Sequence, residues 1–140
     1  MKNKRPIIVI DGYFPTCASM ADILRDEGYA ADCYMRERSA EQLQAEQPAL
    51  IILDLHPPYY QDTLQLVEEL RLQPATRATP VIVTTTTARL PNEVALALSR
   101  LRCAILVKPF DIGTFLLQVE QVLGDGRRPA SGGWYLPALA

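Results

Sequence analysis

The stretch Leu-Ile-Ile-Leu-Asp-Leu-His-Pro-Pro, residues 50–58, decides the fold of this 140-residue chain. Four consecutive apolar residues lead directly into Asp54, and Pro57 and Pro58 then interrupt regular structure because proline has no backbone N–H to donate. An unbroken apolar run of this length is typical of a strand covered on both faces, as in the middle of a parallel sheet. Asp54 is therefore predicted to end a buried strand, at the edge where open α/β sheets bind their ligands.

Four further strand-like runs occur along the chain, at residues 7–10, 31–35, 80–83 and 104–107. A segment with apolar residues at helical spacing follows each strand. Residues that favour helix starts precede or open these segments: Pro15 with Thr16, the Ser39 and Gln42 capping box, Asp62, Pro91 and Asp111. Strands alternating with helices in this way predict an α/β protein with a parallel sheet, right-handed crossovers and helices on both faces.

Composition and charge limit the classes of function. The 140 residues, 49% of them hydrophobic, suffice for one domain with a substantial core. The net charge of −2 gives no electrostatic reason to expect nucleic acid or a membrane surface as partner, and no apolar segment reaches transmembrane length. The three cysteines, Cys17, Cys33 and Cys103, lack Cys-x-x-Cys spacing, so free thiols in a reducing cytoplasm are expected.

The chain changes character after residue 124. Residues 1–124 hold all of the predicted strands and helices. Residues 125–140, in which Asp125 is followed by Gly, Arg, Pro, Ala and Ser, are predicted to form a C-terminal linker and tail. The tail carries an isolated apolar patch at residues 134–137, including Trp134. Such a patch is expected either to dock on this domain or a neighbouring copy, or to belong to a disordered terminus.

Polar residues gather where the predicted strands end. Asp11 follows the first strand, Asp54 ends the third, the threonines 84–87 end the fourth and Lys108 follows the fifth. Because the carboxyl ends of parallel strands share one edge of a sheet, these groups are expected to lie together. A nucleophilic carboxylate, a second carboxylate for a divalent cation, a hydroxyl and a lysine are the groups that phosphoryl transfer onto an aspartate requires.

Over residues 5–124 the sequence resembles the receiver domain of bacterial two-component response regulators. The resemblance rests on four segments in the right order and spacing: residues 7–11 (Ile-Ile-Val-Ile-Asp), 50–58, 74–85 (Pro-Ala-Thr-Arg-Ala-Thr-Pro-Val-Ile-Val-Thr-Thr) and 106–111 (Leu-Val-Lys-Pro-Phe-Asp). It implies a flavodoxin-like (βα)5 fold, a doubly wound parallel sheet with strand order 2-1-3-4-5.

The resemblance also implies roles for individual residues. Asp54 matches the phosphoacceptor of the family, and Lys108 matches the lysine that pairs with the phosphoryl group. Thr85 matches the phosphate-binding switch hydroxyl, with Thr84 and Thr86 as alternatives in the same run. The Lys-Pro dipeptide at residues 108–109 further implies a cis peptide bond.

The implied metal site departs from the family pattern. Asp11 matches the first member of an acidic pair, and the resemblance implies that Asp11, Asp54 and the backbone carbonyl of His56 hold Mg²⁺. The second acid of the pair is replaced by Gly12. Mg²⁺ takes oxygen ligands from one or two carboxylates plus waters, so a weak site is expected.

The resemblance implies a signalling domain and not an enzyme in the ordinary sense. Asp54 is expected to accept a phosphoryl group from a sensor histidine kinase or phosphotransfer protein and to signal through contacts with an output protein. Ile105 stands at the place of the aromatic switch residue of the family, so the ring used for that signal is missing. Weak homodimers are expected through the helices that flank the fifth strand.

Three alternatives stay open at this point. A degenerate pseudo-receiver would serve as a protein-interaction module without phosphorylation, since fold does not fix function. A haloacid-dehalogenase-type aspartate phosphatase would need a second aspartate two residues after Asp11, where this chain has Tyr13. A flavin binder would need a hydroxyl-rich phosphate loop after the first strand, which residues 11–15 do not provide.

Overall fold

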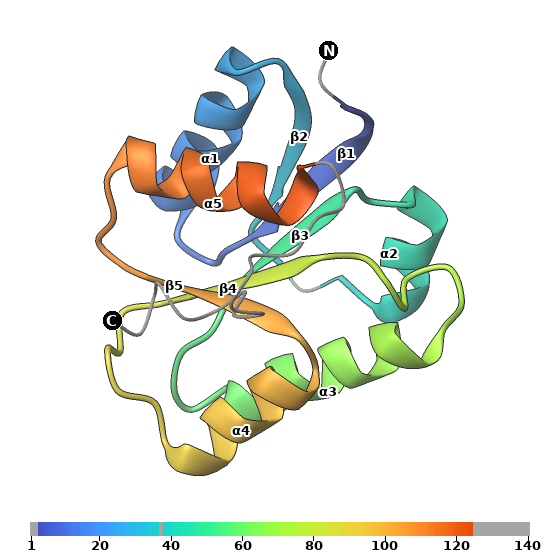
Figure 1. Cartoon of the computed structure of the whole chain (residues 1–140), viewed down its shortest axis with the longest axis vertical. Coiled ribbons are helices and arrows are strands. Elements are labelled where there is room, and N and C mark those ends of the chain that lie inside the picture. The colour runs from blue at the N-terminus through green and yellow to red at the C-terminus, as the bar shows by residue number, and fades with distance from the viewer. Residues whose placement is uncertain (1–2, 37, 125–140) are drawn as a thin grey trace.

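The computed structural model describes residues 3–36 and 38–124, and the predicted tail with Trp134 lies outside these ranges. Its centre is a five-stranded sheet in which every neighbouring pair of strands is parallel, in the order β2-β1-β3-β4-β5 (Figure 1). The strands are β1 (Asn3–Ile10), β2 (Tyr29–Tyr34), β3 (Leu50–Asp54), β4 (Val81–Thr85) and β5 (Cys103–Val107). The predicted flavodoxin-like topology is confirmed.

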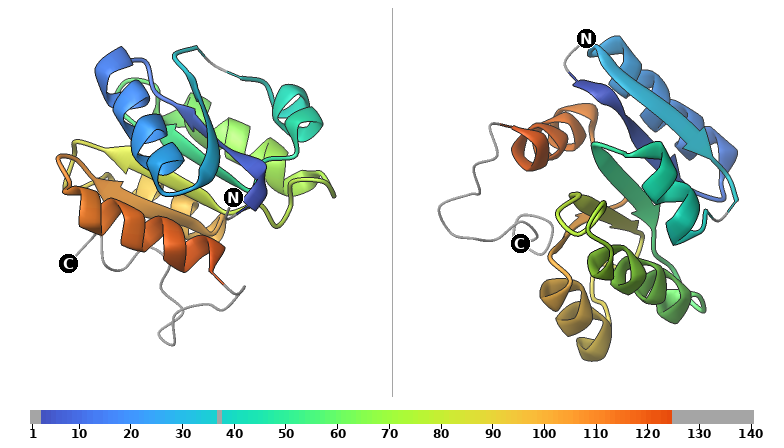
Figure 2. Two further views of the ribbon diagram at one scale, coloured as in Figure 1. Left: turned by 90° about the horizontal axis from the view of Figure 1, so that it is seen from above. Right: turned by 90° about the vertical axis from the view of Figure 1, so that its right-hand side faces the viewer.

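Helices cover both faces of the sheet. They are α1 (Phe14–Asp26), α2 (Ala40–Glu46), α3 (Tyr60–Leu72), α4 (Asn92–Arg100) and α5 (Ile112–Leu123). Helices α1 and α5 lie on one face, and α2, α3 and α4 lie on the other (Figure 2). None of the helices within the described ranges is long and apolar enough to cross a lipid bilayer.

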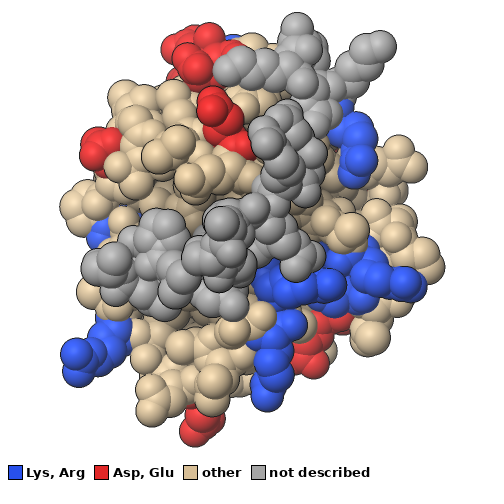
Figure 3. All heavy atoms as spheres, viewed as in Figure 1, with Lys and Arg blue, Asp and Glu red and all other residues tan. Residues whose placement is uncertain are grey.

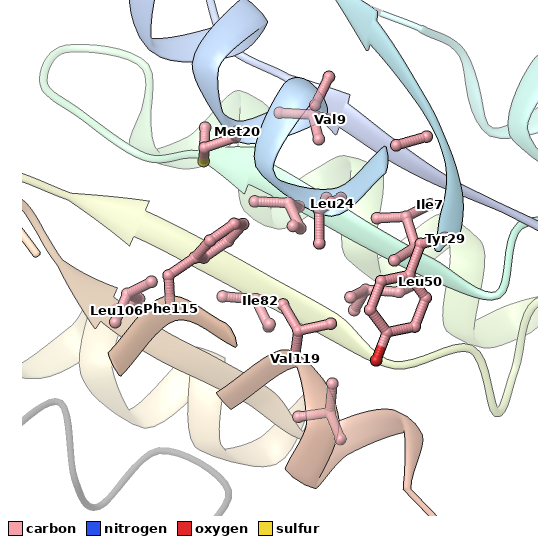
Figure 4. Close-up of a cluster of buried hydrophobic side chains, with 14 of the residues drawn as sticks. Ile7, Val9, Met20, Leu24, Tyr29, Leu50, Ile82, Leu106, Phe115 and Val119 are labelled. Carbon is pink, nitrogen blue, oxygen red and sulfur yellow. The ribbon is translucent and has the colours of Figure 1, made fainter. Parts of the chain in front are cut away.

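Strand β3 is buried from both sides, as its apolar run predicts. Leu50 and Ile52 pack with α1 and α5 in one cluster (Figure 4), whereas Ile51 and Leu53 pack with α2, α3 and α4 in the other. Leu50, Ile51 and Ile52 are fully buried. Full burial of one such side chain contributes roughly 1.5–3 kcal/mol, so the strand that ends in Asp54 is held firmly in place.

Two predicted helix caps are present. The Ser39 hydroxyl accepts a hydrogen bond from the backbone N–H of Gln42, and the Gln42 side chain accepts one from the backbone N–H of Ser39, which completes the capping box of α2. The Asp111 carboxylate accepts a hydrogen bond from the backbone N–H of Thr114 at the start of α5. Short-range patterns of this kind are readable from sequence because all of their partners lie within one turn.

The predicted cap of α3 at Asp62 is wrong. Helix α3 begins at Tyr60 with Tyr59 as its N-cap residue, and Asp62 lies inside the first turn. The chain turns immediately after Pro58, where the N–H of Tyr59 donates a hydrogen bond to the carbonyl of His56 at 2.9 Å. Asp62 still favours the helix start because a carboxylate in the first turn interacts well with the helix dipole.

The expectation of three free thiols is also wrong. Cys17 of α1 and Cys33 of β2 are joined as a disulfide, with their Cα atoms 5.7 Å apart. Cys103 is buried and free. The pairing brings together residues that are 16 positions apart in the sequence, and a search for local Cys-x-x-Cys spacing cannot detect such a tertiary contact.

Candidate functional site

Three of the predicted site residues meet at the carboxyl edge of the sheet. Asp11 follows β1, Asp54 ends β3 and Lys108 follows β5. The Lys108 Nζ atom lies 2.8 Å from Asp11 Oδ2 and 3.0 Å from Asp54 Oδ1. One ammonium group therefore bridges two carboxylates that lie 43 residues apart in the chain.

The protonation of Lys108 follows from this contact. Burial by itself would lower the pKa of the amine, but the hydrogen bonds and negative charges of Asp11 and Asp54 outweigh it and raise the pKa above the usual lysine value. Asp11 is only 2% exposed, and a buried carboxylate needs a partner of opposite charge. A charged Lys108 is therefore part of the ground state of the site.

The side chain of His56 is a contact that the sequence prediction missed. Its Nδ1 atom lies 2.7 Å from Asp54 Oδ2, and its ring packs edge-on against Tyr59 with 5.5 Å between ring centroids. The predicted role of His56 was confined to its backbone carbonyl, which in the structure accepts the N–H of Tyr59. The available signal was the spacing, because residues i and i+2 of an extended chain point to the same side.

Each of the carboxylate oxygens of Asp11 and Asp54 has a partner within the protein, either a hydrogen-bond donor or a charged side chain. Asp11 Oδ1 accepts the backbone N–H of Tyr13 at 2.9 Å, and Lys108 contacts its Oδ2. Asp54 Oδ1 is held by Lys108 and Oδ2 by His56. The two carboxylates are thus fully engaged within the domain itself.

The donor chemistry still fits Mg²⁺. Asp11, Asp54 and the carbonyl of His56 supply oxygen atoms, the ligand type that Mg²⁺ takes together with waters, and each oxygen has a second lone pair. Within the described ranges, no group of three or more His, Cys, Asp and Glu side chains is arranged to hold a metal. The two carboxylates and one carbonyl are thus the oxygen groups that this edge of the sheet would offer to the ion, with Gly12 beside Asp11.

Gly12 lies in open space. A Cβ atom built on it would meet no heavy atom within 4 Å, and its φ angle is not positive. The backbone at this position therefore does not require glycine. Gly12 lines a cavity of about 590 Å³ that extends from Asp54 between α2 and α3, so a side chain added here would project toward free space beside the carboxylates.

The threonines at the end of β4 differ in their contacts. Thr84 lies opposite Asp54 in the sheet and its hydroxyl donates to the carbonyl of Leu53 at 3.5 Å. The Thr85 hydroxyl accepts the N–H of Thr87 at 3.1 Å, which leaves its own hydrogen available to donate. The backbone carbonyl of Thr85 accepts the N–H of Lys108 at 2.7 Å, so the two predicted phosphate-binding residues are tied together.

The structure also shows the Lys108–Pro109 peptide bond and the surroundings of Ile105. The peptide bond between Lys108 and Pro109 is cis, as the resemblance implied. Ile105 is 2% exposed and packs in the core beneath α3 and α4. The aliphatic side chain that stands at the place of the family's aromatic switch residue is thus part of the core.

Comparison with solved structures identifies the architecture. The chemotaxis protein CheY4 of Vibrio cholerae matches with a TM-score of 0.70 and 21% identity over 86% of this chain and 100% of its own. A response regulator from Thermotoga maritima matches with a TM-score of 0.71 and 18% identity over 88% of this chain and 100% of its own. The fold is that of a CheY-like receiver domain.

The receiver fold recurs in proteins of different organisation. A CheY-like receiver domain protein from Methanospirillum hungatei has a TM-score of 0.68 and 19% identity, with 89% of this chain and 97% of the other covered. A receiver domain of a histidine kinase from Syntrophus aciditrophicus has a TM-score of 0.66 and 21% identity, with 89% of this chain and 95% of the other covered. No family model and no curated protein matches the sequence.

Proposed function

We propose that this chain is a receiver module of two-component signalling in which Asp54 accepts a phosphoryl group. The observation that carries the proposal is the bridge from Lys108 to both Asp11 and Asp54, with distances of 2.8 and 3.0 Å. It combines a nucleophilic carboxylate, a second carboxylate and a fixed cation at one point of a receiver fold. This is the set of groups that phosphoryl transfer onto aspartate requires.

In the proposed reaction an oxygen of Asp54 attacks the phosphorus of a phosphohistidine on a sensor kinase or phosphotransfer protein. A P–O bond to the carboxylate forms while the P–N bond breaks, and the electron pair returns to the imidazole of the donor. Lys108 and the Thr85 hydroxyl neutralise charge on the phosphoryl oxygens. Asp11, Asp54 and the His56 carbonyl would hold Mg²⁺, which supplies further neutralisation. The module transfers a group to itself and is not an enzyme in the ordinary sense.

A second candidate function follows from the saturation of the site. Lys108 and His56 already hold both oxygens of Asp54, and position 12 supplies no carboxylate for a metal. A site closed in this way suits a pseudo-receiver that binds its output protein without phosphorylation. Output would in either case pass through surface contacts, with no nucleic acid as partner.

An experiment with beryllofluoride, which mimics a phosphoryl group on aspartate, distinguishes the receiver function from the pseudo-receiver function. Amide NMR spectra are recorded with and without Mg²⁺ and beryllofluoride on wild type and on Asp54→Asn. The receiver function predicts shifts around Asp54, Thr85 and Lys108 that require Mg²⁺ and vanish in the variant. Unchanged wild-type spectra at saturating reagent would reject phosphorylation and favour the pseudo-receiver.

A further inference from the structure

Three arginines surround a small hollow at the edge of the sheet opposite Asp54. Arg71 lies in the last turn of α3, Arg77 in the connection to β4, and Arg102 between α4 and β5. The hollow has a volume of about 110 Å³ and is lined by these arginines together with Ala78, Thr79, Pro80, Val81, Ala104 and Val122. No Asp or Glu of residues 3–36 and 38–124 is part of this lining.

Backbone carbonyls hold the guanidinium groups close together. Arg71 donates from Nε to the carbonyl of Leu101 at 2.8 Å and from Nη1 to that of Thr79 at 2.7 Å. Arg71 Nη1 and Arg102 Nη2 also both donate to the carbonyl of Arg77, at 3.3 and 3.2 Å. Two positive charges therefore converge on one neutral oxygen, and the exposed side chain of Arg77 adds a third at the same place.

Among the described residues, no carboxylate is paired with these three arginines at the hollow. The pKa of Arg71 is lowered by burial and further by the charge of Arg102. The chain has 16 acidic residues and a net charge of −2, yet none of the described acids lines the hollow. Figure 3 shows Lys and Arg side chains gathered on the lower right of this face, with acidic side chains directly beside them.

The backbone conformation of Arg102 matters for the test of this hollow. Its φ angle of 61° lies in the left-handed region, which glycine adopts freely and an arginine adopts at a cost. Glycine is the usual residue where a chain leaves a helix in this conformation. Such a conformation persists only where the surrounding structure holds it in place.

We propose that the hollow formed by Arg71, Arg77 and Arg102 binds a phosphate group, either free or carried by a small organic molecule. Guanidinium groups match the geometry of phosphate oxygens and bind them with paired hydrogen bonds. The hollow, at about 110 Å³, has room for a tetrahedral oxyanion. The site is independent of Asp54 and of the proposed phosphorylation, because it lies at the other edge of the sheet.

The test uses a variant that removes charge without weakening the fold. Arg102→Gly deletes one guanidinium and relieves the left-handed backbone, so its melting temperature without ligand should equal or exceed that of wild type. Gln47→Gly is the matched control, since Gln47 also has a positive φ, of 49°, and does not line the hollow. Arg77→Ala removes a second, exposed guanidinium.

Melting curves and titration calorimetry are recorded in inorganic phosphate, in a nucleoside monophosphate and in chloride at equal ionic strength. Phosphate at about ten times its dissociation constant should raise the melting temperature of wild type and Gln47→Gly by roughly 3–6 °C beyond chloride. Arg102→Gly and Arg77→Ala should each bind roughly tenfold more weakly.

The two ligands distinguish the sources of the phosphate group. Binding of inorganic phosphate supports a free anion, and binding of the nucleotide alone supports a phosphate carried by an organic molecule, provided that Arg102→Gly weakens it in either case. Equal melting temperatures in all three solutions would overturn the proposal. Wild-type affinity in Arg102→Gly would place the anion elsewhere and overturn it as well.

Discussion

The imidazole Nδ1 of His56 lies 2.7 Å from Asp54 Oδ2, on the carboxylate whose other oxygen is held by Lys108 at 3.0 Å. An incoming phosphoryl group therefore meets carboxylate oxygens that each already have one partner, and loosening one of these contacts would free an oxygen for attack. His56 is the more mobile partner by its surroundings, since its side chain is 47% exposed against 16% for Lys108. We infer that His56 opens first.

Replacing His56 should therefore accelerate modification of Asp54. The His56→Ala variant keeps the backbone carbonyl and frees Oδ2, and a half-exposed pair of this kind contributes up to about 1 kcal/mol. Phosphorylation by acetyl phosphate should be roughly two- to fivefold faster by this reasoning. His56→Asn, whose amide can still donate a hydrogen bond, is the matched control. Its phosphorylation rate should lie between those of wild type and His56→Ala. Equal rates for all three proteins would show that the His56 contact does not restrict Asp54.

Loss of Lys108 should destabilise the fold. Lys108→Met keeps the length of the side chain but leaves two clustered carboxylates without their cation, and breaking such a buried pair costs about 2–4 kcal/mol. Urea unfolding measures the loss. Arg89→Met, which removes an exposed charge, should change the free energy of unfolding by less than about 0.5 kcal/mol.

A double variant checks the cause of that loss. Asp54→Asn removes one of the two charges, so Lys108→Met should cost less in the Asp54→Asn background than in wild type. Identical costs in the two backgrounds would show that the effect comes from packing of the lysine stem and not from charge.

Adding the missing acid should strengthen the metal site. In Gly12→Asp the new carboxylate enters open space without backbone strain and stands beside Asp11 and Asp54. It should lower the melting temperature without metal by like-charge repulsion and raise Mg²⁺ affinity roughly tenfold. Gly12→Asn is the matched neutral control. Equal Mg²⁺-induced shifts of the melting temperature in wild type, Gly12→Asp and Gly12→Asn would refute the metal-site account.

Cys103 should contribute a pH-dependent stability. Burial raises the pKa of its thiol from 9.0 to about 12, so the folded protein keeps a proton that the unfolded chain loses above pH 9. The contribution is fully present below pH 9 and declines as pH rises toward 12, at up to about 1.4 kcal/mol per pH unit. The stability difference between wild type and Cys103→Ala, measured by urea unfolding at several pH values, should narrow accordingly. A constant difference from pH 8 to pH 10.5 would contradict the raised pKa.

Weak self-association through α4 and α5 remains a prediction. Leu96 of α4 and Leu117 of α5 are 62% and 56% exposed, on the helices that flank β5. Leu96→Ser and the charge reversal Arg100→Glu should shift the sedimentation coefficient at high concentration toward the monomer. Leu72→Ser, on exposed Leu72 of α3, is the control and should leave association unchanged. A wild type that stays monomeric at millimolar concentration would refute the prediction.

The sequence predicted those features that follow from regular periodicity. The apolar run before Asp54 indicated a central strand, and parallel strand ends share an edge, so Asp11, Asp54 and Lys108 could be placed together before any coordinates. The side-chain contact of His56 and the Cys17–Cys33 pair were missed. The i, i+2 spacing of Asp54 and His56 was a signal for the first contact, but the rotamers that close it are set by the folded chain. The cysteine pair is a tertiary contact between residues 16 positions apart, which no local spacing encodes.

Site-resolved mass spectrometry after incubation with Mg²⁺ and acetyl phosphate tests the central claim most directly. The account predicts that wild type gains one phosphoryl group, that the label maps to Asp54, that omission of Mg²⁺ slows its appearance, and that Asp54→Asn stays unmodified. A wild type that gains no phosphoryl group under conditions in which Gly12→Asp is labelled at Asp54 would contradict the account and leave the pseudo-receiver function in its place.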